Sequence, residues 1–307
     1  MKRILITGSS GLVGRAVRRD LQLRGHDVSG LDLRADHHER GDVRDREHVS
    51  AALDGVAGVI HLAAVSRVAW GERDPEGCWT TNVDGLRTVL ECARSSAASP
   101  WFVFASSREV YGQAEVLPVS EDAALLPVNV YGRTKLAGEM LIEAARSDGL
   151  RAATVRLSNV YGSTADHEDR VLPAFARAAA RGATLRVDGS RNEFDFTHVS
   201  DTSRGLVALV EHLEAGAEPP PPIQFVTGVS TTLAEAARYA VSFGRVGAVI
   251  TEAPSRAFDV GRFRGTWARA HALLGWSPRV AISEGLERLV SDFQRDCEHP
   301  RPQVGAQ

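Results

Sequence analysis

The sequence predicts a doubly wound α/β fold, with helices on both faces of a parallel sheet, followed by a smaller C-terminal lobe. Up to about residue 160 of the 307 residues, short apolar runs alternate with longer stretches that have helical periodicity. This alternation indicates a parallel sheet, and the right-handed crossover rule then places helices on both of its faces. A glycine-rich turn at residues 8–14 follows the first apolar run, as in Rossmann-type dinucleotide-binding domains.

The expected elements of the first domain alternate in strict order. Apolar runs that end at glycine or polar residues predict buried strands, at 4–6, 28–32, 56–62, 101–105 and 151–157, with a later one at 223–226. Apolar residues at helical spacing predict helices, at 13–21, 49–53, 75–94 and 131–147. Asp74-Pro75 is a typical helix start, because aspartate caps a helix and proline fits its first turn.

The periodic pattern weakens after about residue 160, and this change divides the chain. We expect residues 1–160 to form the dinucleotide-binding domain. Residues 161–298 are expected to form mainly a substrate-binding lobe, with segments that return to the first sheet. Thr232 and Glu235 have the spacing of a capping box at a helix start. The polar tail, 299–307, is expected to be disordered.

Composition and charge are those of a globular protein, with 43% hydrophobic and 24% charged residues. A net charge of −3 favours neither nucleic acid nor an anionic membrane surface as partner. No segment approaches the ~20 consecutive apolar residues of a membrane span. The three cysteines are widely spaced and the ten histidines show no ligand spacing, so we expect no disulfide framework and no metal site. A cytoplasmic location follows as the default expectation.

The glycine-rich turn is the candidate cofactor site. Glycines let the backbone approach a pyrophosphate, and the N-terminus of the following helix favours its charge. Its candidate residues are Gly8, Ser10, Gly11, Leu12, Val13 and Gly14. Asp32 lies 18 residues past Gly14, where a carboxylate can bind the adenosine ribose and repel a 2′-phosphate, which favours NAD over NADP. Asp42 and Val43 are candidates for the adenine edge, and a solvated surface aspartate remains the alternative for Asp32.

Tyr131 and Lys135 are the candidate catalytic pair. Residues four apart share one face of a helix, so the two side chains are expected to lie together. A nearby positive charge favours the phenolate, and Lys135 is therefore expected to lower the pKa of Tyr131. A base beside a dinucleotide indicates removal of a proton and a hydride from an alcohol.

Several motifs occur in one order along nearly the whole chain. They are the glycine-rich turn, His61-Leu62-Ala63-Ala64, Thr81-Asn82-Val83-Asp84-Gly85, the segment 106–112, the Tyr131/Lys135 pair, the segment 156–162 and Leu274-Gly275-Trp276. On these motifs the chain resembles the extended short-chain dehydrogenase/reductase superfamily. Within that superfamily it is similar to the NAD-dependent nucleotide-sugar epimerase/dehydratase family.

The resemblance implies roles for individual residues. Ser107 would bind the sugar 4-hydroxyl, Tyr131 would be the base, and Lys135 would hold the nicotinamide ribose. Further cofactor-binding candidates within the matching motifs are Leu62, Ala63, Ala64, Asn82 and Val160, together with Tyr131 and Lys135 themselves. The implied substrate-binding residues are Ser107, Arg108, Asn159, Arg191 and Arg256. Phe194 stands where the family often has arginine, which weakens the case for Arg191 as a second diphosphate contact.

The implied chemistry is oxidation of a nucleotide sugar at C4 by tightly held NAD. Return of hydride to the other face of the keto sugar would make the enzyme a 4-epimerase, which is the outcome we expect. Removal of the C5 proton by Glu109 would instead make it a 4,6- or 5,6-dehydratase, and a decarboxylase is also possible on this pattern. The residue before Glu109 is Arg108, which cannot replace the acid that dehydratases often carry there. Glu109 could also simply pair with Arg108.

Two other classes compete with this interpretation. An NADPH-dependent ketoreductase would release its cofactor at each turnover, and Asp32 argues against that class. A non-catalytic dinucleotide sensor is disfavoured because Ser107, Tyr131 and Lys135 are all present. Related proteins pair through the two long helices near the middle of the chain, so the resemblance also implies a homodimer. Leu136, Met140 and Leu141 on the second of these helices could instead pack on their own sheet.

Overall fold

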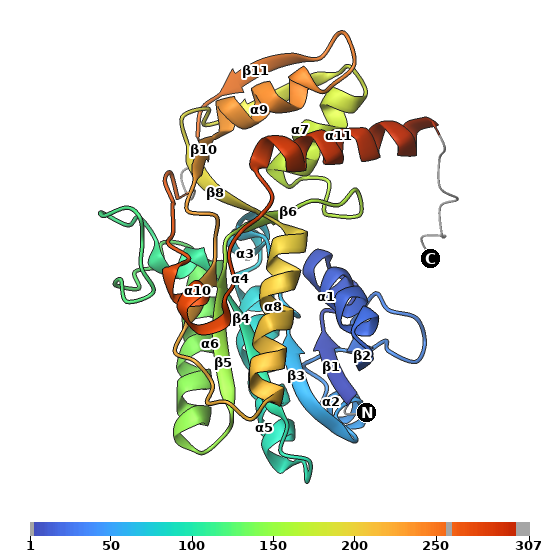
Figure 1. Cartoon of the computed structure of the whole chain (residues 1–307), viewed down its shortest axis with the longest axis vertical. Coiled ribbons are helices and arrows are strands. Elements are labelled where there is room, and N and C mark those ends of the chain that lie inside the picture. Colours follow the sequence, from blue (N-terminus) through green and yellow to red (C-terminus); the bar gives the residue numbers. More distant parts are fainter. Residues whose placement is uncertain (1–2, 256–259, 299–307) are drawn as a thin grey trace.

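A six-stranded parallel sheet forms the centre of the first part of the molecule (Figure 1). The computed structural model describes residues 3–255 and 260–298. The strand order is β2-β1-β3-β4-β5-β9, with β1 (Arg3–Thr7), β2 (Asp27–Leu31), β3 (Val56–His61), β4 (Trp101–Ser107), β5 (Ala152–Leu157) and β9 (Ile223–Phe225). The doubly wound fold predicted from the alternating pattern is confirmed.

Helices cover both faces of this sheet because successive residues of a buried strand point to opposite sides. Ile4 and Ile6 pack toward α1 (Leu12–Leu23), α8 (Val199–Glu214) and α10 (Ala268–Leu274). Leu5 packs on the opposite face, with α2 (Arg46–Ala52), α5 (Gly85–Ser95) and α6 (Val130–Ser147). The elements α8, β9 and α10 come from the second half of the chain and return to the first sheet.

The helix expected over 75–94 is interrupted. It consists of α4 (Pro75–Trp79), a π-helical turn η1 (Thr80–Asp84) and α5, and an unpredicted helix α3 (Val68–Arg73) precedes it. Asp74 caps α4 as expected, accepting a hydrogen bond from the backbone of Gly77 at 2.9 Å. The wide turn carries Asn82, whose buried side chain bonds the backbone of Val65 and the hydroxyl of Thr134. Periodicity cannot reveal such a turn, because it depends on these tertiary partners.

The C-terminal lobe lies over the carboxyl ends of the parallel strands (Figure 1). It contains two small sheets. In one, β8 (Glu193–His198) lies between β10 (Ser230–Thr232) and β6 (Asn159–Tyr161), and in the other β11 (Val249–Ala253) pairs with β7 (Thr184–Asp188). The helices α7 (Val171–Ala180), α9 (Leu233–Ser242) and α11 (Ile282–Glu298) complete the lobe around its own apolar core. The predicted capping box at Thr232 and Glu235 is present at the start of α9. The tail 299–307 lies outside the described residues.

Candidate active site

A cavity of about 770 Å³ lies where the carboxyl edge of the sheet meets the C-terminal lobe. Its wall includes Gly8, Ser107 and Tyr131 from the first part of the chain and Asn159 and Phe194 from the lobe. Ligands of open α/β folds bind at this edge of the sheet, and the volume suits a small molecule or cofactor.

The glycine-rich turn is built for close approach of a ligand. Gly8 has a φ of +71°, and a β-carbon there would lie 2.7 Å from the backbone nitrogen of Ala63. A β-carbon on Gly14 would lie 2.3 Å from the carbonyl oxygen of Gly8. The helix α1 begins directly after the turn, with no side-chain cap and no acidic residue in its first turn. Its free backbone N–H groups therefore suit a pyrophosphate.

Asp32 joins the turn to the cavity. Its carboxylate accepts hydrogen bonds from the backbone N–H groups of Ser10 at 3.0 Å and Arg34 at 2.8 Å, and it lines the cavity. The side chain of Arg34 is 60% exposed and lies 3.9 Å from Asp32. A carboxylate fixed in this way can accept ribose hydroxyl groups and repels a 2′-phosphate, so the donor set fits NAD.

The structure brings most of the predicted cofactor residues to one cavity. Those that line it are Gly8, Gly11, Leu12, Val13, Gly14, Asp32, Asp42, Val43, Leu62, Ala63, Ala64, Tyr131, Lys135 and Val160. Ser10 and Asn82 are not among the lining residues. Ser10 holds Asp32 through its backbone N–H, and Asn82 ties the loop after β3 to α6. Both residues support the cavity wall without lining it. The sequence motifs alone do not distinguish such a supporting residue from one that contacts the cofactor.

Ser107, Tyr131 and Lys135 meet in the wall of the same cavity. The Ser107 hydroxyl lies within hydrogen-bond reach of the Tyr131 hydroxyl. Lys135 is buried, donates a hydrogen bond from Nζ to the carbonyl oxygen of Ala105 at 2.8 Å, and lies 5.8 Å from the centre of the Tyr131 ring. The arrangement places a hydroxyl donor, a candidate base and a cation around one point.

The lowering of the Tyr131 pKa that was expected from Lys135 is not found. Burial raises the pKa of Tyr131 to about 12, although the Ser107 hydroxyl and the positive charge of Arg170 act in the opposite direction. Burial likewise lowers the pKa of Lys135 to about 8. The sequence pattern predicted that the two side chains share a helix face, but it could not predict their burial. Burial has a larger effect on the pKa of Tyr131 than the nearby charges. A bound positive group beside Tyr131 would favour its phenolate.

The pKa of Lys135 predicts how stability changes with pH. Its folded pKa, about 8, lies below its ordinary value of 10.5, so the unfolded chain binds the extra proton between these values. Stability therefore rises with pH across this window, by ~3 kcal/mol at ~1.36 kcal/mol per unit. The free energies of unfolding of wild type and Lys135→Met are measured by denaturation from pH 7 to 10. With rising pH, the stability of the wild type should increase relative to that of the variant. A constant difference would contradict the assigned titration.

Glu109 is held by two neighbours. Its Oε1 is 2.8 Å from Nη2 of Arg108, and its Oε2 accepts a hydrogen bond from Nδ2 of Asn129 at 2.7 Å. Asn129 is also the cap of α6, because its Oδ1 accepts the backbone N–H of Gly132. The pairing of Glu109 with Arg108, one of the two readings of the sequence, is present in the structure. Glu109 also lines the cavity.

The segment from Ser106 to Tyr111, which carries Ser107, Arg108 and Glu109, is anchored at both ends. Ser106 donates a hydrogen bond to Glu139, which forms a buried ion pair with Arg156 at 2.7 Å. Arg156 in turn donates to the hydroxyl of Tyr111 at 3.0 Å. The catalytic candidates Ser107 and Glu109 and the substrate-binding candidate Arg108 are thereby fixed from behind the cavity wall.

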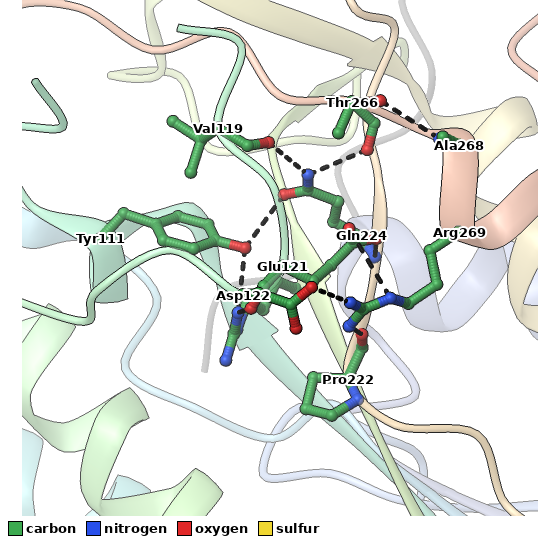
Figure 2. Close-up of polar contacts among 10 residues, drawn as sticks. Tyr111, Val119, Glu121, Asp122, Pro222, Gln224, Thr266, Ala268 and Arg269 are labelled. Carbon is green, nitrogen blue, oxygen red and sulfur yellow. Dashed lines mark hydrogen bonds and ion pairs between the residues drawn. The ribbon is translucent and has the colours of Figure 1, made fainter. Parts of the chain in front are cut away.

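Gln224 of β9 extends this anchor to the C-terminal lobe. Figure 2 shows its side chain between Tyr111, Val119 and Thr266. The Tyr111 hydroxyl donates to its Oε1 at 3.1 Å, and its Nε2 donates to the carbonyl oxygens of Val119 and Thr266. Sequence reasoning missed Arg156, Glu139 and Gln224. The available signal was a polar residue inside an apolar strand, at 156 in β5 and at 224 in β9.

The two predicted arginines of the lobe have different outcomes. Arg191 is exposed and is not among the lining residues, whereas Arg186 of β7 lines the cavity. Arg191 lies in the turn between β7 and β8. Phe194 lines the cavity and its ring carries the guanidinium of Arg108. Arg256 lies outside the described residues.

Residues 3–255 and 260–298 contain no group of three or more metal-ligating side chains. Within the same ranges no helix is both long and apolar enough to cross a membrane.

A dinucleotide turn and a Ser/Tyr/Lys set on one cavity define an enzyme of the short-chain dehydrogenase/reductase class. Residues 4–224 match the model of the NAD dependent epimerase/dehydratase family, so the chain belongs to that family. Its cofactor is NAD, in agreement with the glycine-rich turn and Asp32. The resemblance inferred from the sequence motifs is confirmed.

Similar proteins catalyse different reactions. The chain is 29% identical to UDP-glucose 4-epimerase of Mycolicibacterium smegmatis, over 96% of this chain and 100% of the relative. It is also 29% identical to UDP-glucuronic acid decarboxylase 1 of Danio rerio, over 97% of this chain and 74% of the relative. The solved structure of TunA, an NAD-dependent NDP-hexosamine 5,6-dehydratase, is 29% identical with a TM-score of 0.85, covering 96% of this chain and 98% of TunA. Modification of a nucleotide sugar is common to all three, and identity does not separate their reactions.

Proposed function

We propose that the protein is a nucleotide-sugar 4-epimerase that works through a transient 4-keto intermediate. Bound NAD supplies the hydride acceptor and donor at C4. Tyr131 as phenolate takes the proton of the 4-hydroxyl, while Ser107 holds that oxygen by a hydrogen bond. The keto sugar then presents its other face, and the same steps run in reverse with Tyr131 returning the proton. No net oxidation occurs, and the configuration at C4 is inverted.

The contacts of the Glu109 carboxylate are the observation that favours epimerisation over dehydration. Both of its carboxylate oxygens already accept hydrogen bonds or an ion pair, from Arg108 and Asn129. These contacts hold the carboxylate toward Arg108 and Asn129, so only its remaining lone pairs could take a C5 proton. Epimerisation at C4 requires no base at C5, so it is compatible with a Glu109 that only pairs with Arg108 and Asn129.

A dehydratase or decarboxylase is the second candidate. Glu109 lines the cavity and its backbone N–H bonds the Ser107 hydroxyl at 3.2 Å, so its carboxylate is attached close to the reacting centre. Glu109 could act on C5 through a lone pair that its two contacts leave free. The epimerase proposal is preferred because it accounts for the contacts of Glu109 with Arg108 and Asn129 without giving Glu109 a second role.

Replacing Glu109 distinguishes these two candidates. We expect Glu109→Gln to keep turnover within about threefold of wild type, because its remaining oxygen still accepts from Arg108. A base at C5 would contribute about 10²–10⁴-fold to the rate of turnover. A loss of activity of that size in Glu109→Gln would therefore contradict the proposal that Glu109 takes no part in the reaction. Product formation with a panel of nucleotide sugars provides the measurement. A thermal melt of the same variant shows whether any loss comes from unfolding.

A homodimer and a cytoplasmic location complete the proposal. On α6, Leu136 and Leu141 are partly buried and pack against apolar clusters of their own chain. Met140 of the same helix is 67% exposed, and Trp79 of α4 is 44% exposed. These exposed apolar side chains lie on the two helical segments through which the resemblance implies pairing.

A further inference from the structure

Arg108 is a buried cation in the wall of the cavity, next in sequence to Ser107. Its side chain is 8% exposed and it lines the cavity. The central carbon of its guanidinium lies 4.7 Å from the ring centre of Phe194 and 5.6 Å from that of Phe263. Taking a guanidinium out of water is unfavourable unless its N–H groups find partners. Its partners therefore indicate what the side chain does.

Only some of the N–H groups of this guanidinium have a hydrogen-bond acceptor in the described part of the chain. Arginine has five N–H donors. Nε donates to Oδ1 of Asn159 at 3.1 Å, and Nη2 lies 2.8 Å from Oε1 of Glu109. Nη1 is buried, and no acceptor for it is present in the described part of the chain. An unpaired buried donor of a charged group is destabilising unless a bound molecule supplies the acceptor.

Asn159 presents a second donor at the same place. Its oxygen faces Arg108, so its NH₂ group points away from the guanidinium. Asn159 also lines the cavity, and nothing within residues 3–255 and 260–298 accepts a hydrogen bond from that NH₂ group. Arg108 thus fixes the amide with its donors available to a ligand.

The other arginines of the cavity wall are more exposed than Arg108. The most buried of them are Arg67, which pairs with Asp169 and is 14% exposed, and Arg170, which pairs with Asp166 and is 25% exposed. Arg186 pairs with Asp188 and is 74% exposed, and Arg44 pairs with Asp42 and is 47% exposed. Exposed pairs of this kind contribute little to binding because water already solvates them. A desolvated arginine with spare N–H groups binds anionic oxygens through strong charge-assisted hydrogen bonds.

We propose that Arg108, with Asn159 beside it, binds an anionic oxygen of the nucleotide sugar. This inference rests on the proposed function, because it assumes that a nucleotide sugar occupies the cavity. Two parts of such a molecule carry anionic oxygens: the diphosphate, and the carboxylate of a uronic acid. In the second case the preferred substrate is a nucleotide-linked uronic acid rather than a neutral hexose.

Calorimetric binding to the NAD-loaded protein tests this role. Tyr131→Phe is the background, so that ligands are bound without conversion. The probes are UDP, UDP-glucose and UDP-glucuronate, or the corresponding dTDP or GDP compounds where uridine is not bound. Arg108→Gln is compared with Arg295→Gln, a matched control at an ion pair of α11 that is 73% exposed.

Each outcome has one meaning. If Arg108 binds the carboxylate, Arg108→Gln weakens UDP-glucuronate by at least about tenfold and leaves UDP-glucose nearly unchanged. If it binds the diphosphate, all three probes weaken by a similar factor of about ten or more. Unchanged affinity for all probes would overturn the proposal. The control variant should bind every probe as the background protein does.

Two further measurements separate a loss of binding from unfolding and from failure of the proposed function. Arg108→Gln leaves a buried Glu109 without its cation, so its thermal melt is recorded alongside. If it does not fold, Arg108→Lys keeps the charge but loses the fork of donors, and an undiminished affinity in that variant would overturn the proposal. If the background protein binds no nucleotide sugar at all, the proposed function fails instead. That result differs from one in which the background protein and Arg108→Gln bind the probes with equal affinity.

Discussion

Tyr131→Phe is expected to reduce turnover by about 10³-fold while leaving NAD bound, because only the proton-accepting oxygen is removed. The ring of Tyr131 and the glycine-rich turn remain in place. Turnover of nucleotide sugars and the NAD content released from purified protein are the two measurements. Both are needed, since loss of cofactor would also abolish activity.

Tyr239→Phe is a matched control, because Tyr239 lies on α9, is 39% exposed and does not line the cavity. It should keep full activity. Retention of more than a tenth of wild-type activity by Tyr131→Phe would remove this tyrosine from its role as base. Loss of bound NAD in that variant would instead show that its hydroxyl mainly holds the cofactor.

Arg156→Met is expected to destabilise the protein by about 3–5 kcal/mol, because it leaves a buried carboxylate without its cation. The side chains of Arg156 and Glu139 are 4% and 9% exposed. The same change frees the hydroxyl of Tyr111 from one of its partners, so activity should also fall in the folded variant. Chemical denaturation gives the first quantity, and turnover under native conditions gives the second.

Two variants test whether charge burial is the cause. The double variant Arg156→Met with Glu139→Gln should recover much of the lost stability, because no unpaired charge remains. Arg288→Met removes an exposed pair of α11 and should change stability by no more than about 1 kcal/mol. A similar small change for Arg156→Met would mean that the buried pair does not stabilise the segment behind the site.

The sequence predicted the parts of the fold that depend on local pattern. The strands of the first sheet, the glycine turn and the α9 capping box all depend on spacing and residue type, and all are present. The helix expected over 75–94 is present, but its π-helical turn at Thr80–Asp84 was not predicted, because Asn82 in that turn has partners far away in sequence. The pairing of β8 with β6 and with β10 joins segments far apart in sequence, which periodicity does not predict.

The candidate site was predicted to a similar extent. Motif positions identified Asp32, Ser107, Tyr131 and Lys135, which line one cavity. The raised pKa of Tyr131 could not be predicted, since it follows from burial that no spacing reveals. The anchoring of Ser106 through Glu139 involves residues 33 positions apart, and only the structure shows it. Arg191, a candidate from the resemblance, is exposed and is not among the residues that line the cavity.

Incubation with a panel of nucleotide sugars in deuterated water, followed by chromatography and mass spectrometry, tests the central claim most directly. Epimerisation by hydride return predicts a product of unchanged mass and altered retention, with no deuterium bound to carbon. The hydride never exchanges with solvent, and the C5 proton is not removed. A product that has lost water or carbon dioxide, or that carries deuterium at C5, would contradict epimerisation and point to Glu109 as a C5 base.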